Sequence, residues 1–178
     1  MSETQPHGKR RIDRITAPGF VEGLSELSLT DLRARRDECL AEREYLSLLR
    51  RLLQGRLDIV RAEAERRRIG DDPSTLVAHI AMAMSSEHPT GSVRGEAVRL
   101  SGPPEAMALA RRRVEGLVAD SADPRSLPDD ELADAQQRLE AEERTVSADR
   151  RTVLDIHDAL QEELKRRFKE NPAGALAP

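Results

Sequence analysis

Aromatic residues are nearly absent from this sequence. It contains no tryptophan, one tyrosine and two phenylalanines, so aromatic residues make up only 2% of its 178 residues. Leucine, alanine, arginine and glutamate are in surplus instead, a composition typical of long helices and coiled coils rather than of a packed globular core. At this length we expect one domain, or one domain with tails.

Cysteine and long apolar runs are also scarce. Cys39 is the only cysteine, so no disulfide can form within the chain. The first residues lead into no apolar segment, and no run of residues approaches the length needed to span a bilayer. We therefore expect a cytoplasmic protein that does not enter a membrane.

Charge, by contrast, is abundant and of both signs. Charged residues make up 35% of the chain, yet they nearly cancel to a net charge of −4. A nucleic-acid-binding protein would show a basic face with stacking aromatics, so we expect no direct DNA binding. The histidines and the cysteine lack zinc-site spacing, and no phosphate-binding loop or nucleophile–base pair is recognisable. We expect no metal site, no catalytic residues and no enzyme.

Proline and glycine divide the chain into segments. Two long helices are predicted over residues 28–69 and 128–170, and about forty residues at 1.5 Å each would span on the order of 60 Å. Around them we expect a flexible N-terminal segment (1–27), a connector with short helices (71–127) and a tail (171–178). Within the connector the helical candidates are 71–87 and 104–120, and 97–100 is a candidate strand.

Apolar residues repeat every seven positions in both predicted helices. They are Leu32, Cys39, Leu46, Leu53 and Val60 in the first helix and Leu132, Leu139, Val146, Val153 and Leu160 in the second. Such heptads form the seam of a coiled coil. The expected fold class is all-α, a long antiparallel two-helix coiled coil, because the connector is long enough to return the chain to its start.

The two helices also match each other at an offset of 100 positions. The identical residues are Leu32, Ala41, Glu42, Ser47, Arg50, Arg51, Asp58, Glu63, Arg66 and Arg67, each repeated 100 positions later. Ser47, Arg50 and Asp58 lie within about 80° of each other around a helix and flank the seam. Such a stripe is either a solvated flank of the coiled coil or, when two copies face the same side, a polar platform with twofold symmetry.

The spacing of the stripe resembles a family signature. RsiG anti-sigma factors of sporulating actinobacteria carry E-x3-S-x2-R-x3-Q-x3-D once on each helix of an antiparallel coiled coil. The first copy here comprises Ser47, Arg50, Gln54 and Asp58, with Arg43 at the glutamate position and Glu42 and Glu44 beside it. The second copy comprises Glu143, Ser147, Arg150 and Asp158, with Leu154 at the glutamine position.

The resemblance implies a ligand and a partner. It implies that the two copies bind cyclic di-GMP as an intercalated dimer, with Arg43 and Glu44 as possible further contacts. It also implies that the loaded protein sequesters a sigma factor of the flagellar and sporulation class (WhiG) and so represses sporulation genes. The alternative is a constitutive coiled-coil adaptor without a nucleotide ligand.

A second apolar strip lies away from the seam on the first helix. It consists of Tyr45, Leu48, Leu52 and Ile59. A two-helix hairpin would leave this strip exposed to water, which favours a role in docking the partner. Equally, residues 76–84 or 106–118 of the connector could fold back and cover it.

Overall fold

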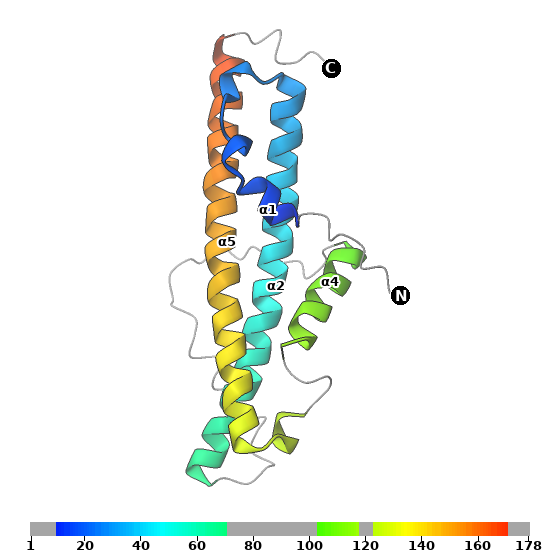
Figure 1. Cartoon of the computed structure of the whole chain (residues 1–178), viewed down its shortest axis with the longest axis vertical. Coiled ribbons are helices and arrows are strands. Elements are labelled where there is room, and N and C mark those ends of the chain that lie inside the picture. The colour runs from blue at the N-terminus through cyan, green and yellow to red at the C-terminus, as the bar shows by residue number, and fades with distance from the viewer. Residues whose placement is uncertain (1–9, 71–102, 118–122, 171–178) are drawn as a thin grey trace, which may run out of the picture. The chain divides into compact units, whose positions relative to one another are not determined.

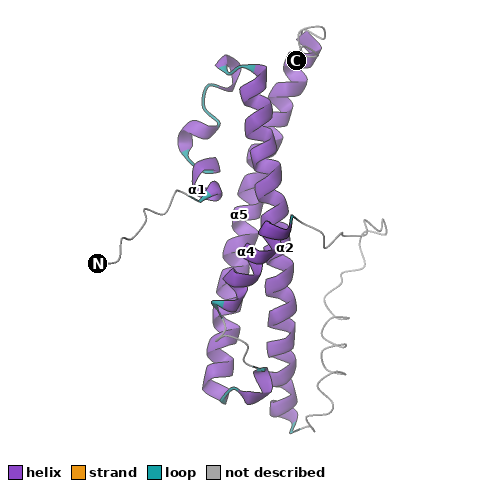
Figure 2. Cartoon of the chain, turned by 90° about the vertical axis from the view of Figure 1, so that its right-hand side faces the viewer, coloured by secondary structure: helices purple, strands orange, loops and turns teal. Residues whose placement is uncertain are grey.

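The computed structural model describes residues 10–70, 103–117 and 123–170, and every regular element in these ranges is helical (Figure 2). The α-helices are α1 (Arg11–Ile15), α2 (Leu29–Ile69), α4 (Pro104–Glu115) and α5 (Asp129–Glu170), labelled in Figure 1. Three short 3-10 helices are η1 (Pro18–Phe20), η2 (Leu24–Glu26) and η4 (Pro124–Ser126). The all-α prediction is confirmed for this part of the chain. The helix expected at 71–87, the strand expected at 97–100 and the tail lie outside the described residues.

The two long helices begin and end at residues suited to those positions. The Ser28 hydroxyl accepts a hydrogen bond from the backbone N–H of Asp31 at 3.0 Å, which caps the start of α2. Gly70, with φ of 71°, follows its last residue. The first turn of α5 holds three acidic residues, which oppose the positive end of the helix dipole. Of the helices in the described ranges, none is both long and apolar enough to cross a membrane.

The chain forms two compact units, and each contains a segment of both long helices. Unit 1 comprises residues up to Leu46 and from Ala148 onward, and unit 2 comprises Ser47–Ser147. In each unit the two segments run in opposite directions side by side (Figure 1). In unit 2, for example, Arg61 pairs with Glu140 at 3.1 Å while the later Arg67 pairs with the earlier Asp129 at 2.6 Å. The predicted antiparallel pairing of the two helices is confirmed.

The heptad residues form the core of both units. All ten predicted seam residues are buried, and Leu132, at 3%, is the most exposed of them. The helix pair of unit 2 buries further leucines, Leu49 and Leu57, beside the seam. Burying a large aliphatic side chain stabilises a fold by roughly 1.5–3 kcal/mol. The seam therefore supplies the main apolar stabilisation of the helix pair.

Residues 10–27 are the described part of the N-terminal segment that the sequence predicts to be flexible. They form α1, η1 and η2, and they bury Ile12, Ile15 and Phe20. The guanidinium of Arg35 on α2 lies 5.3 Å from the centre of the Phe20 ring and donates a hydrogen bond to the Phe20 carbonyl. These apolar and cation–π contacts hold the segment against α2.

In each unit a short α-helix is tied to a long helix by an ion pair between an arginine and a glutamate. In unit 1, Arg11 of α1 pairs with Glu42 of α2 at 3.5 Å. In unit 2, Arg113 of α4 pairs with Glu142 of α5 at 2.6 Å. Glu42 and Glu142 are equivalent positions of the sequence repeat. The repeat thus extends from the long helices to the way in which short helices attach to them.

Candidate ligand-binding site

Residues from both copies of the polar motif meet in unit 2. The Nε of Arg50, on α2, donates to the Glu143 carboxylate and to the Ser147 hydroxyl, both on α5, at 3.0 Å each. The Ser147 hydroxyl in turn donates to the same Glu143 oxygen at 2.9 Å. Two residues of the second copy and one of the first therefore form a single hydrogen-bonded cluster across the two helices.

The exposure of this cluster suits a binding site. The side chain of Arg50 is 39% exposed and that of Glu143 is 20% exposed, so both remain partly in contact with water. Both contacts from Arg50 use Nε, which leaves the two terminal nitrogens of the guanidinium outside them. Those nitrogens are the pair that binds phosphates and the acceptor edge of guanine in a forked geometry.

The remaining residues of the first copy share a face of α2 within unit 2. Ser47, Gln54 and Asp58 are half-buried, like Arg50, whereas Arg51 is exposed. This alternation follows from the helix period, because positions 47, 50, 54 and 58 return to one side while position 51 turns away. The predicted stripe beside the seam therefore exists as a partly buried polar face.

The second copy is divided between the two units. Glu143 and Ser147 belong to unit 2, while Arg150 and Asp158 belong to unit 1. Arg150 is half-buried, as Arg50 is, and Arg151 is exposed, as Arg51 is. The carboxylate of Asp158 is largely exposed and lies 3.2 Å from Nδ1 of His157. The pattern of exposure around the two arginines is the same in both copies.

Glu42 does not replace the glutamate that is missing from the first copy of the motif. The side chain of Glu42 is 6% exposed and pairs with Arg11 of α1, so it serves the packing of unit 1. Arg43, at the motif position itself, is half-buried, and Glu44 is exposed. Glu44 is therefore the acidic neighbour that remains accessible to a ligand.

One of the four residues of the second apolar strip is buried, and the other three are partly exposed. Leu48 is 6% exposed, and Tyr45, Leu52 and Ile59 are half-buried. In unit 2, which contains Leu48, Leu52 and Ile59, helix α4 packs through the fully buried Ala110 and through the Arg113–Glu142 ion pair. The connector helix thus folds back onto this unit, whereas residues 76–84 lie outside the described part.

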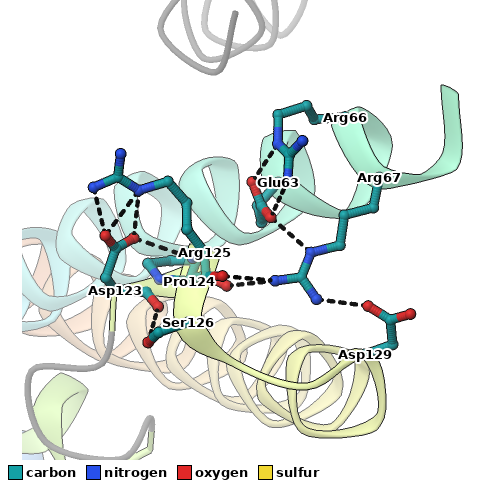
Figure 3. Close-up of polar contacts among 8 residues, drawn as sticks. All are labelled: Glu63, Arg66, Arg67, Asp123, Pro124, Arg125, Ser126 and Asp129. Atoms are coloured by element: carbon teal, nitrogen blue, oxygen red, sulfur yellow. Dashed lines mark hydrogen bonds and ion pairs between the residues drawn. The ribbon is translucent and has the colours of Figure 1, made fainter. Parts of the chain in front are cut away.

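A second duplicated cluster has a role that the sequence did not reveal. In unit 2, the Glu63 carboxylate is fully buried and accepts hydrogen bonds from Arg66 at 2.8 Å and Arg67 at 2.6 Å (Figure 3). Arg67 also donates to the carbonyls of Pro124 and Arg125, at 3.0 and 3.3 Å, in the turn that precedes α5. The end of α2 is thereby fastened to the beginning of α5.

The equivalent residues do the same in unit 1. Glu163 accepts from Arg166 and Arg167, at 2.7 and 2.8 Å. Arg167 also donates to the carbonyls of Leu24 and Leu27, at 2.6 Å each, just before α2 begins. The two arginines lower the pKa of Glu163 from 4.5 to about 2, the hydrogen bond from Arg166 being the larger cause. We call the two clusters the Glu63 clamp and the Glu163 clamp.

The described residues hold no group of three or more His, Cys, Asp or Glu side chains that could bind a metal ion. Many of their polar groups are instead pairs of a basic side chain and a carboxylate, and the partly exposed pair of Arg50 and Glu143 joins the two long helices. Such groups can bind a ligand with phosphates and hydrogen-bonding ring edges.

A protein-family model matches part of the chain. The model of the RsiG-like family covers residues 18–83, which include the turns before α2, all of α2 and the first copy of the motif. No curated protein matches the chain. The family indicates an anti-sigma-type regulator. The match confirms the predicted resemblance, and over residues 18–83 the chain is RsiG-like.

Proposed function

We propose that this protein is a cytoplasmic anti-sigma factor that binds cyclic di-GMP on its duplicated polar motif. When loaded, it holds a WhiG-type sigma factor and so represses sporulation genes. The observation that carries the proposal is the contact of Arg50, from the first copy, with Glu143 and Ser147, from the second. If the motif residues were only a solvated flank of the coiled coil, no contact between the two copies would be required.

The chemistry of the cluster fits a guanine nucleotide. Arginine binds phosphate oxygens or the N7 and O6 acceptors of guanine, and a carboxylate accepts from the guanine N1–H and N2–H₂ groups. A ligand dimer of cyclic di-GMP offers these groups in repeated form, as the motif offers its arginines and aspartates twice. Ser47, Gln54 and Asp58, on the same partly buried face as Arg50, would supply further hydrogen bonds.

The ion pair with Glu143 also prepares Arg50 for binding. Ordering a free arginine side chain on binding costs roughly 0.5–1.5 kcal/mol. In the free protein Nε is already fixed by Glu143 and Ser147, which directs the guanidinium before any ligand arrives. A ligand would therefore gain the forked contact at a reduced entropic cost.

The family match and the apolar strip support the proposal of a protein partner. An anti-sigma-type regulator requires a surface for its sigma factor, and Tyr45, Leu48, Leu52 and Ile59 are the candidates on α2. Because Leu48 is already buried, the half-buried members Tyr45, Leu52 and Ile59 are the ones positioned to contact a partner. The alternative function is a constitutive adaptor that binds its partner without a nucleotide.

The decisive experiment is calorimetric titration of the protein with cyclic di-GMP, alone and with the WhiG-type sigma factor present. We expect Arg50→Ala and Arg150→Ala each to weaken binding at least tenfold, because charge-assisted hydrogen bonds are worth about 1.5–3 kcal/mol each. Arg51→Ala and Arg151→Ala are matched controls, since both side chains are exposed and adjacent in sequence to the motif arginines.

Stability measurements separate a lost contact from a lost fold. Arg50→Ala should lower the free energy of unfolding by about 1 kcal/mol or less, because its partly exposed ion pair with Glu143 is removed. Arg51→Ala should stay within about 0.5 kcal/mol. Absence of heat with and without the sigma factor would favour the adaptor, and equal losses in Arg50→Ala and Arg51→Ala would refute the assignment of the motif face.

A further inference from the structure

A groove with an apolar floor and a basic rim lies between α2 and α5 in unit 1. Its volume is about 310 Å³. The apolar lining is formed by Leu29, Leu164 and Phe168, and Phe168 is 48% exposed. A phenylalanine that is half open to water beside two leucines is an unusual feature on a chain with two phenylalanines in all.

The rim of the groove is positively charged. Arg33, Arg36, Lys165 and Lys169 line it, and none of the residues that line it is acidic, although the chain as a whole carries a net charge of −4. Arg36 pairs with Asp37 and Lys165 pairs with Glu162, and those two carboxylates are 61% and 72% exposed. Exposed ion pairs of this kind contribute little and exchange readily. The groove therefore presents a cationic surface to an incoming partner.

The sequence repeat provides an internal comparison. The seam residues are apolar in both copies, but the groove residues are not retained. Positions 29, 164, 165 and 168 correspond to Asp129, Ala64, Glu65 and Arg68. The apolar floor and basic rim are therefore no consequence of the coiled-coil pattern, which both copies share.

The shape of the groove fits a helix. Its lining residues recur at positions 29, 33 and 36 of α2 and at 161, 164, 165, 168 and 169 of α5, which is one face of each helix over about two turns. The groove is lined by side chains of two α-helices and has no strand edge, so an extended peptide would find no row of backbone groups to pair with as an added strand. A helix satisfies its own backbone and inserts apolar residues spaced at i, i+3, i+4 and i+7.

We propose that this groove is a docking site for an acidic amphipathic helix of a protein partner. Apolar residues of that helix would cover Phe168, Leu164 and Leu29, and its carboxylates would pair with the basic rim. The site is independent of the proposed nucleotide function, because no residue of the polar motif lines it.

The test uses the full chain and a fluorescein-labelled helical peptide of about 18 residues. The peptide carries leucines at i, i+3, i+4 and i+7 and glutamates on its other face, and a second peptide has lysines in place of the glutamates. Fluorescence anisotropy should show that the acidic peptide binds at least about tenfold more tightly than the basic one. Phe168→Ala should lower the affinity for the acidic peptide about tenfold or more. The double variant Lys165→Glu, Lys169→Glu should bind the basic peptide more tightly than the acidic one.

Ile69→Ala is the matched control. Ile69 is exposed to the same extent as Phe168, 48%, but belongs to unit 2, so its loss should leave the affinity unchanged. Circular dichroism of each variant would verify that helicity is retained. Equal affinity for both peptides, or equal losses in Phe168→Ala and Ile69→Ala, would overturn the proposal. Concentration-dependent self-association that Phe168→Ala abolishes would also overturn it, because the occupant would then be a second copy of the chain.

Discussion

Replacing Glu63 by glutamine tests whether the Glu63 clamp stabilises the helix pair. The substitution keeps the volume of the side chain and removes its charge. The Glu63 carboxylate accepts three hydrogen bonds from guanidiniums, two from Arg66 at 2.8 Å and one from Arg67 at 2.6 Å. The carboxylate is fully buried, and the two arginines are only 13% and 21% exposed. Glutamine offers one acceptor oxygen in place of two, and its amide N–H₂ group would face the N–H groups of the two guanidiniums.

The magnitude follows from these contacts. Charge-assisted hydrogen bonds are worth about 1.5–3 kcal/mol each, and breaking a buried ion pair on one side costs about 3–5 kcal/mol. Part of that loss is recovered, because Arg67 keeps Asp129 and the carbonyls of Pro124 and Arg125. We therefore expect Glu63→Gln to lower the free energy of unfolding by about 2–4 kcal/mol.

Urea unfolding followed by circular dichroism at neutral pH measures this change. Glu163→Gln is the first comparison, and it should cost about half as much, because Glu163 is 13% exposed and its partner Arg166 is 47% exposed. Glu65→Gln, on the same helix as Glu63 but 48% exposed, should leave stability unchanged. A Glu63→Gln variant as stable as the Glu65→Gln variant would refute the reasoning.

Two further predictions concern the loss of stability at low pH and the backbone conformation at Gly23. The pKa of Glu163 is about 2 in the folded protein against 4.5 ordinarily, so its contribution to stability is present above about pH 4.5 and is lost as the pH falls toward 2. Over this range the free energy of unfolding should therefore drop less in Glu163→Gln than in the unaltered protein. Equal pH profiles of the two proteins would contradict the assignment. Gly23 has φ of 61°, and a Cβ added there would meet only an atom of Glu26 at 3.7 Å, so Gly23→Ala should cost about 1 kcal/mol through backbone strain alone. Gly19→Ala, which lacks the positive φ and would meet nothing within 4 Å, is its control in the same urea assay.

The sequence predicts the helix pair well because its core is periodic. Heptads fix which side of each helix is buried, and Cys39 and Leu139, for example, are both fully buried as expected. The same reasoning places Arg50 and Arg51 on different faces, which the structure also shows. Features that repeat along one helix can be predicted because a single angle per residue determines them.

Contacts that depend on the path of the backbone could not be predicted in this way. Arg67 donates to carbonyls 57 and 58 positions away, and those carbonyls face it only because η4 turns there. Helix α1 is five residues long, too short for an apolar period to reveal that Ile12 and Ile15 are buried. The identities at positions 63, 66 and 67 were visible in the repeat, but only the folded turns show what they bind.

The burial of Cys39 gives the protein a natural reporter of local opening. Its side chain is fully buried in the seam of unit 1, and burial raises the pKa of its thiol to about 11, with a smaller contribution from Glu38. At neutral pH only about one thiol in ten thousand would be ionised, and the thiolate is the reactive form. A thiol reagent can therefore modify Cys39 only when the helices separate around it. The rate of labelling at this one position, with no engineered probe, measures how often the unaltered protein opens there and how strongly a bound ligand or partner suppresses that opening.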